Sequence, residues 1–218
     1  MLQHITSDHI KSWERFYRSN FINSLTGYKS VSLAGTADEN GNPNLAIFSS
    51  IIHLGSNPAL VGFINRPLEA SHHTLDNIRA TGVYTINHIH PAIVEAAHQT
   101  SAKYAAGVSE FAAVGLTPLF TAGCRAPFVL ESRVKYALRL EEIIPIAINR
   151  TFLVIGSITD ILAGSELMQA DGFLKLEAAE TVASLGADSY YLPDLLTRLA
   201  YAKTDQPVRP VSGTNADE

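Results

Sequence analysis

The sequence has few of the features that would give it a covalent framework, a metal-thiolate centre or a membrane anchor. It holds a single cysteine, Cys124, among 218 residues, so one chain can form neither a disulfide nor a cysteine-based zinc or iron–sulfur site. The N-terminal residues carry charges and no apolar core of signal-peptide length, and no run approaches the roughly 18 apolar residues of a membrane span. These absences predict a cytoplasmic protein with a reduced thiol and no membrane partner.

Charged residues are also scarce. Asp, Glu, Lys and Arg make up 17% of the chain, and the formal net charge is −5. Lys and Arg do not cluster, so no nucleic-acid surface is expected. Low charge together with 46% hydrophobic residues favours more buried surface than one monomer needs, which predicts a homo-oligomer. A well-packed monomer is the alternative.

Common catalytic and metal-binding motifs are absent as well. The chain has no G-x-G-x-x-G after its first strand, no phosphate-binding G-x-x-x-x-G-K-[ST] loop and no G-x-S-x-G elbow. His88 and His90 lie two residues apart on a predicted strand and share a face, an arrangement that a transition metal can use. No run of carboxylates or thiols accompanies them. We therefore predict no metal site and keep a metal-binding barrel only as an alternative.

Runs of β-type residues and hairpin signals predict a mainly β fold with helices. Two such runs flank "DENGNP", in which the Asn40-Gly41 pair is typical of a hairpin turn because both residues tolerate positive φ. Strands and helices do not alternate regularly, which argues for an antiparallel barrel rather than a doubly wound parallel sheet. Further strands are predicted over 58–65, 83–89, 126–145 and 151–163, and helices over 8–27, 69–82, 91–107 and 174–186.

The pattern predicts three consecutive segments. Residues 1–27 form an N-terminal helical segment, and 28–165 form the barrel domain. Residues 166–218 form a C-terminal helix and an arm that packs on a partner subunit.

Two adjacent hydroxyls interrupt an apolar run in "NPNLAIFSSIIHLGSNPALVGFINRP", residues 42–67. In a regular strand Ser49 and Ser50 would point to opposite faces, and buried hydroxyls need partners. Arg66 ends the adjacent predicted strand and offers a planar fork of donors to a phosphate, and the next helix N-terminus adds N–H groups. A phosphorylated cofactor across the strand ends would satisfy these groups. Alternatively, the serines bond to backbone and Arg66 is a surface cation.

This stretch, followed by "HTLDNIRATGVYTINH", "SEFAAVGLTP" and "APFVLES", resembles the flavin reductase-like, FMN-binding split-barrel family, and the flavoredoxin-type branch in particular. The resemblance extends over about residues 25 to 163. It implies a six-stranded antiparallel Greek-key split β-barrel that forms a homodimer, with FMN near the subunit interface.

The resemblance also implies which positions bind the flavin. Asn44 and the backbone of Ala46 would meet the ring edge, while Ser49 and Ser50 would meet the ribityl chain or the phosphate. The predicted cofactor-binding residues are Asn44, Leu45, Ala46, Phe48, Ser49, Ser50, Arg66, Thr74, Asn77, Lys103 and Phe111.

Several of these positions have a simpler structural interpretation. Thr74 and Asn77 match the family's T-x-x-N-I stretch, with Thr74 as a phosphate partner, but both can also serve only the helix start. Lys103 is a candidate cation for the phosphate or a solvated helix residue. Phe111 would pack close to the ring, whereas Phe48 can equally belong to the core.

The resulting hypothesis is an NAD(P)H-dependent, flavin reductase-like oxidoreductase. NADH or NADPH would give a hydride to FMN, and the electrons would pass on to an acceptor. The flavin carries the chemistry, so no catalytic side chain is predicted. Because no dinucleotide fingerprint is present, an FMN-binding electron carrier or flavin sensor without nicotinamide turnover is the alternative. The expected partners are flavin, nicotinamide and a second copy of the chain.

Overall fold

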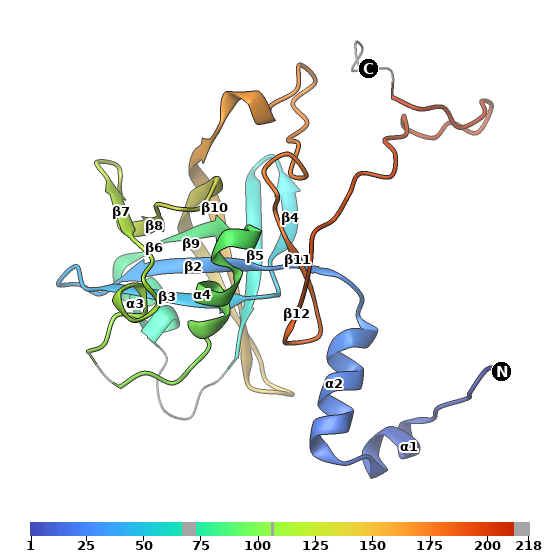
Figure 1. Ribbon diagram of the computed structural model, residues 1–218, viewed down its shortest axis with the longest axis horizontal. Helices are drawn as coiled ribbons and strands as arrows, with labels where there is room; N and C mark the ends of the chain where they lie inside the picture. Colours follow the sequence, from blue (N-terminus) through green and yellow to red (C-terminus); the bar gives the residue numbers. More distant parts are fainter. Residues whose placement is uncertain (67–72, 106, 212–218) are drawn as a thin grey trace.

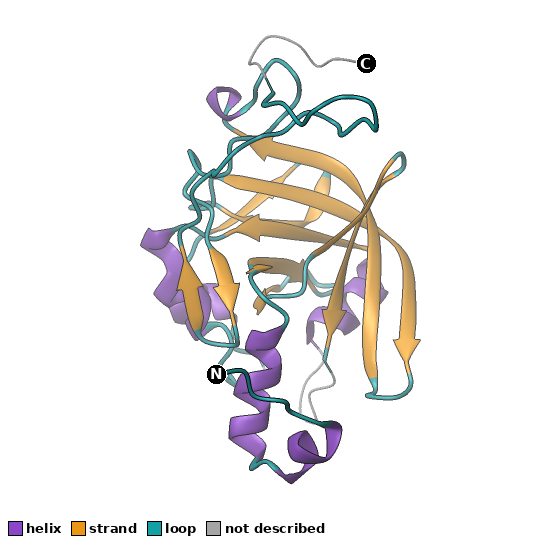
Figure 2. Cartoon of the chain, turned by 90° about the vertical axis from the view of Figure 1, so that its right-hand side faces the viewer, coloured by secondary structure: helices purple, strands orange, loops and turns teal. Residues whose placement is uncertain are grey.

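A curved antiparallel sheet of seven strands forms the centre of the computed structural model, which describes residues 1–66, 73–105 and 107–211 (Figures 1 and 2). The strand order is β3-β2-β6-β9-β10-β5-β4. The strands are β2 (Ser32–Ala37), β3 (Pro43–Phe48), β4 (Ile52–Ser56), β5 (Ala59–Asn65), β6 (Val83–His88), β9 (Val134–Ile146) and β10 (Thr151–Ala163). The mainly β, antiparallel class agrees with the prediction.

The sheet has one strand more than the predicted six because the first long apolar run divides. β3 ends at Phe48 and β4 begins at Ile52, so Ser49 and Ser50 lie between two strands. The prediction that both serines belong to one regular strand is wrong. β3 and β4 are the two edges of the sheet, and no strand pairing joins them among the described residues.

The run predicted as one strand over 126–145 also divides. Its first part belongs to β8 (Cys124–Val129), which pairs with β7 (Pro118–Thr121) in a separate two-stranded sheet. β9 then starts at Val134. The Ser132 hydroxyl lies in the break and donates to the carbonyl oxygens of His88 and Val134, so a local polar contact ends the first strand.

The hairpin predicted at Asn40-Gly41 is confirmed and joins β2 to β3. The Asp38 carboxylate accepts hydrogen bonds from the backbone N–H groups of Asn40 and Asn42, each at 2.9 Å. Gly41 has a φ of 87°, in the left-handed region that glycine adopts without strain. Asp38 therefore serves the turn.

The helices agree with the predictions in part. The helix predicted over 8–27 is two helices, because the Glu14 carboxylate accepts from Phe16 and Tyr17 N–H groups and starts a second one. The helix predicted over 91–107 ends at Gln99. Of the helix predicted over 69–82, residues 69–72 lie outside the described residues. The helical elements are α1 (Ser7–Ser12), α2 (Arg15–Leu25), α3 (His73–Thr81), η1 (Pro91–Ile93), α4 (Val94–Gln99), α5 (Glu110–Val114) and η2 (Ser165–Leu167).

The helix predicted over 174–186 is wrong. This segment consists of turns followed by β11 (Ala183–Leu185), which pairs with β1 (Lys29–Ser30) and β12 (Ser189–Tyr191). Glu180 has a φ of 53°, which is incompatible with a right-handed helix. The apolar spacing that suggested a helix instead buries Ala179 and Val182 in two different clusters.

Apolar side chains cover both faces of the sheet. Consecutive residues of β2 show this, because Leu33 belongs to a cluster with Phe111 of α5 and Ala34 belongs to a cluster with Leu75 and Ile78 of α3. Alternation along a strand sends neighbours to opposite faces, so α3 and α5 lie on different sides of β2. No helix in the described part of the chain is both long enough and apolar enough to cross a membrane.

Candidate functional site

The break between β3 and β4 brings Ser50 against the end of β5. The Ser50 hydroxyl accepts from the backbone N–H of Ile64 at 3.1 Å and donates to the carbonyl oxygen of the same residue at 3.3 Å. Ser50 therefore bonds to the backbone, which was the alternative given in the sequence analysis. Ser49, next to it, is half-buried, and its hydroxyl has no hydrogen-bond partner within the described part of the chain.

Arg66 lies just beyond the end of β5, two residues after Ile64. It is exposed and makes no ion pair with another described residue. The Ser50 hydroxyl is hydrogen-bonded to the backbone of Ile64, so residues 49–50 lie beside the end of β5. Ser49 and Arg66 are therefore on neighbouring stretches of chain. A cation and a free hydroxyl in this arrangement are suitable donors for an anionic group.

Three predicted residues meet in one buried hydrogen-bond network. The Asn44 side-chain amide donates to Thr36 Oγ1 at 3.1 Å and to Thr74 Oγ1 at 3.2 Å, and the Asn77 amide donates to Thr36 Oγ1 at 3.1 Å. Thr36 and Asn44 are direct partners across the β2–β3 hairpin. The network therefore fixes the first turn of α3 against this hairpin.

Thr36 is the central acceptor of the network and was not predicted from the sequence. It is fully buried and receives both amides. The signal for it was the hairpin register, because a turn at Asn40-Gly41 places residue 36 opposite residue 44. Thr74, the second residue of α3, accepts through its oxygen and so keeps its own proton available to an anion at the helix N-terminus.

Three predicted residues have side chains in the core. Leu45 and Phe111 belong to the same cluster and are 0% and 1% exposed. Phe48 packs on Phe63 with ring centroids 4.7 Å apart. The backbone N–H of Leu45 donates to the Glu110 carboxylate at 3.2 Å, a contact that was not predicted from the sequence.

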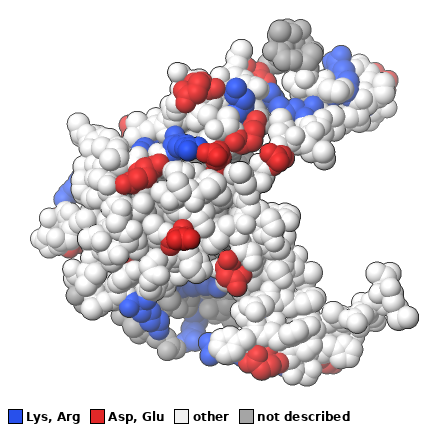
Figure 3. Space-filling model, in the orientation of Figure 1, with Lys and Arg blue, Asp and Glu red and all other residues white. Residues whose placement is uncertain are grey.

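The remaining two predicted residues are Ala46 and Lys103. Ala46 is half-buried on β3, opposite Ala34. Lys103 is exposed after α4 and makes no ion pair among the described residues. On the face shown in Figure 3, a group of Lys and Arg side chains lies at the lower left, below the place of α3 in Figure 1, while both signs of charge are interspersed along the top.

His88 and His90 do not converge on a common point. His88 Nδ1 lies 3.2 Å from the Thr181 hydroxyl, and His90 Nε2 lies 3.0 Å from the carbonyl oxygen of Glu131. Within residues 1–66, 73–105 and 107–211, no three His, Cys, Asp or Glu side chains are close enough together to hold a metal ion.

The family follows from the comparison with known domains. Residues 28–175 match the family model described as "Flavin reductase like domain". The chain belongs to the flavin reductase-like family. The match contains the hairpin, the Ser49–Ser50 break and the network around Thr36, and it confirms the resemblance inferred from the sequence.

Solved structures with the same fold support this assignment. A protein of Shewanella frigidimarina NCIMB 400, provisionally described as a flavin reductase with a split barrel domain, is 50% identical with a TM-score of 0.88, over 92% of this chain and all of that one. Nitrilotriacetate monooxygenase component B from Bacillus cereus is 19% identical with a TM-score of 0.80, over 91% and 99% of the two chains. Flavoredoxin of Desulfovibrio vulgaris (Miyazaki F) is 23% identical with a TM-score of 0.67, over 82% and 92%.

Proposed function

We propose that the chain is an FMN-binding oxidoreductase of the flavin reductase type, in which NADH or NADPH supplies the hydride and a further acceptor receives the electrons. The observation that carries this proposal is the family match over 28–175, which contains every predicted cofactor-binding residue. When bound, the flavin supplies the redox chemistry. The protein's task is to hold and orient it.

The residues present fit a phosphorylated flavin. Ser49 and Arg66 are donors without a partner among the described residues, and the proton of Thr74 is free beside the first turn of α3. Each of these groups can donate a hydrogen bond to an oxygen of a phosphorylated flavin, and the Arg66 guanidinium can neutralise its phosphate. Ser50 takes no direct part in this arrangement, since its hydroxyl is engaged by Ile64; it positions Ser49.

The polar network around Thr36 orients these groups in advance. The Asn44 amide donates to Thr74 Oγ1 and to Thr36 Oγ1. The Asn77 amide, on α3, donates to the same Thr36 oxygen. A donor that is already oriented loses less entropy on binding. We therefore assign Thr36 and Asn77 a positioning role and Thr74 a direct contact.

An anaerobic titration tests the proposed activity. The protein is loaded with FMN or with FAD, and each sample is titrated with NADH and with NADPH while the flavin absorbance is followed. Stoichiometric FMN binding and bleaching by one nicotinamide are the expected results. FMN binding without bleaching by either nicotinamide would favour the electron-carrier or sensor interpretation, and absence of flavin binding would overturn the proposal.

We extend the proposal to the oligomeric state, because the chain exposes far more surface than a compact monomer. Its accessible surface is 13689 Å², whereas a compact monomer of 23.6 kDa exposes about 9,800 Å². α1 and α2 bury none of their residues. An isolated helix as short as the 11 residues of α2 is marginal in water, so it needs a partner surface.

The C-terminal arm also leaves large apolar side chains exposed. Leu196 and Tyr201 are 95% and 94% exposed, and the arm's backbone hydrogen bonds at Ala200 and Val211 are to the arm itself. The arm and α2 project from the same side of the sheet, and a broad hollow separates them (Figures 1 and 3). A second copy of the chain seated in this hollow would cover both, which supports a homodimer.

A further inference from the structure

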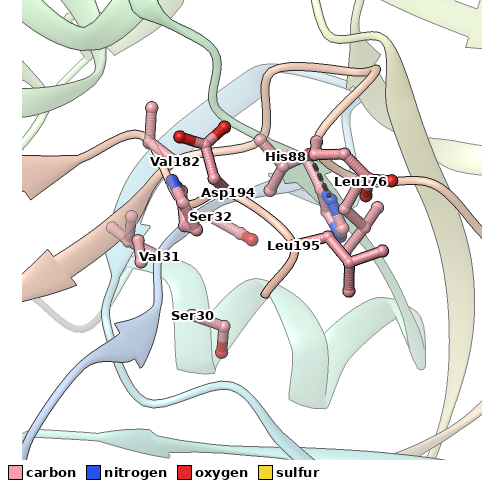
Figure 4. Close-up of a pocket in the computed structure, with 12 residues that line it drawn as sticks. Ser30, Val31, Ser32, His88, Leu176, Val182, Asp194 and Leu195 are labelled. Atoms are coloured by element: carbon pink, nitrogen blue, oxygen red, sulfur yellow. Dashed lines mark hydrogen bonds between the residues drawn. The ribbon is translucent and has the colours of Figure 1, made fainter. Parts of the chain in front are cut away.

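A cavity of about 290 Å³ opens between the sheet and the chain that follows the family-matched region (Figure 4). The sheet side is formed by the start of β2 and the end of β6, together with the adjoining β1, which pairs with β11 in the three-stranded sheet. The opposite side is formed by residues within 176–195, all of which lie beyond the matched residues 28–175. The lining residues that matter here are Ser30, Ser32, His88, Glu177, Ala183 and Asp194.

The sheet side of the cavity carries polar groups without protein partners. Ser32 is 3% exposed, and its hydroxyl has no hydrogen-bond partner among the described residues. His88 uses Nδ1 to meet Thr181, which leaves Nε2 without a partner in the same set of residues. Burial lowers the pKa of His88 to about 4, so the ring is neutral near pH 7. Both groups line the cavity, so a ligand or water there can supply the missing partners.

Charge at the cavity restricts what can enter. Glu177 and Asp194 both line it, and no Lys or Arg is found among its described lining residues. The other walls are apolar and include Val31, Leu176 and Leu195. Two carboxylates beside an apolar space disfavour an anion, and the apolar walls favour a small ring compound. A carbonyl oxygen on that ring would accept from the Ser32 hydroxyl or the His88 ring.

The cavity is also close to the proposed flavin site. Ser32 pairs with Phe48, the residue before Ser49, and the Ser30 hydroxyl donates to the carbonyl oxygen of Ile51 at 2.8 Å. Paired strands lie about 4.8 Å apart. One wall of the cavity is therefore one strand away from the Ser49–Ser50 break.

We propose that this cavity binds the electron acceptor, and that the acceptor is a small uncharged ring compound of the quinone class. Its role as acceptor rests on the proposed function. A quinone takes up two electrons and two protons to become a hydroquinone, which balances the two electrons and two protons that a reduced flavin releases. The segment 176–195 is then the part of the chain that selects the acceptor.

Calorimetric titration of the full chain with menadione, an uncharged two-ring quinone, tests the site without any turnover. We expect saturable binding of one menadione per chain. Ser32→Ala removes one hydrogen bond and should weaken binding about fivefold, and Ala183→Phe should abolish it by filling the space. Ser101→Ala, at an exposed serine after α4, is the matched control and should bind menadione as the unchanged protein does.

An anionic analogue tests the role of the carboxylates. Menadione sulfonate should bind at least tenfold more weakly than menadione, and Asp194→Asn should reduce this difference. Absence of saturable menadione binding, or a Ser32→Ala variant that binds as tightly as Ser101→Ala, would overturn the proposal.

The same samples separate this proposal from the proposed function. FMN binding is followed by its absorbance, and Ser32→Ala should leave it unchanged. Menadione binding to a chain that binds no FMN would support the cavity and refute the flavin-dependent role. If added FMN displaced bound menadione in a one-to-one ratio, the cavity would belong to the cofactor site. That result would overturn the proposal of a separate acceptor site.

Discussion

The Ser50 hydroxyl lies against the backbone of Ile64 and makes two hydrogen bonds to that one residue, at 3.1 Å to its N–H and 3.3 Å to its carbonyl oxygen. It replaces a strand pairing that is lost where β3 gives way to β4. Ser49 has no such partner among the described residues. The two adjacent hydroxyls therefore differ: Ser50 bonds within the sheet, and Ser49 is the one we propose contacts the flavin.

Separate alanine variants should distinguish these roles. Ser50→Ala leaves a partly buried N–H and carbonyl without their partner, so we expect a loss of about 1 to 2 kcal/mol in the free energy of unfolding. Ser49→Ala should change stability by less than about 0.5 kcal/mol and weaken FMN binding severalfold. Urea unfolding and FMN titration measure the two effects. The reverse pattern, with Ser49→Ala destabilising and Ser50→Ala weakening FMN, would refute the assignment.

The hairpin was predictable and the break was not, for a physical reason. The turn at Asn40-Gly41 depends on local backbone preferences and on the neighbouring Asp38, so four or five residues specify it. The break at Ser49–Ser50 depends on a bond to Ile64, 14 residues away. A strand pattern alone carries no information about such a contact.

The same distinction applies to the site and to the mispredicted helix. The residues Asn44, Thr74 and Asn77 came from the family resemblance, but Thr36, which joins them, depends on strand register and helix position together. Residues 174–186 have apolar residues at helical intervals. The structure uses them to cover the sheet from an irregular segment, since tertiary burial outweighs a weak helical preference.

Gly156 and Tyr84 form a close contact inside the sheet that can be tested as a pair. A Cβ on Gly156 would clash with Tyr84 Oη, and this hydroxyl is buried without a partner among the described residues. Gly156→Ala should cost about 2 to 4 kcal/mol of unfolding free energy. Tyr84→Phe should be neutral or stabilising by up to about 1 kcal/mol, since it removes an unsatisfied buried hydroxyl.

A double-mutant cycle sharpens this prediction. In the Tyr84→Phe background, Gly156→Ala should cost about 1 kcal/mol less than in the unchanged protein, because part of the clash is gone. Contacts of 3.0 Å with the Arg139 carbonyl oxygen and Leu138 Cβ remain. Strict additivity of the two changes in urea unfolding would mean that the hydroxyl and the glycine do not interact.

His88 should make stability depend on pH. Burial lowers the pKa of His88 to about 4 in the folded state, whereas an unfolded histidine has a pKa near 6.5. The unfolded chain therefore binds the extra proton first, and stability falls as the pH drops from about 6.5 towards 4. We expect a loss of about 2 kcal/mol between pH 7 and pH 5 from this residue.

The matched variant is His88→Gln, which carries no titrating group. Its unfolding free energy should change less over the same interval. The carboxyls of Asp38 and Asp171 take up protons only below this interval, because hydrogen bonds lower their pKa values. Thermal and urea unfolding at pH 7, 6 and 5 measure the difference. Parallel profiles for the two proteins would show that His88 is not the group responsible.

The exposed N-terminal helices and C-terminal arm predict a dimer that specific charges can dissociate. Phe16, on α2, is 71% exposed and Leu196 is 95% exposed. Placing a charge at each, as Phe16→Arg with Leu196→Arg, should raise the dimer dissociation constant at least 100-fold, because each removes an apolar contact and buries a cation in the interface. Sedimentation equilibrium measures the constant directly.

Phe120→Arg is the matched control, because Phe120 is also exposed, at 48%, but lies on β7 at the opposite end of the molecule (Figure 1). It should leave the dimer intact. Trp13 is the only tryptophan in the chain and packs against Tyr17 and Phe21, so its fluorescence should shift to the red when the dimer dissociates. A chain that sediments as a monomer at micromolar concentration would mean that the arms fold back on their own sheet or receive a different protein, and either outcome would refute the dimer.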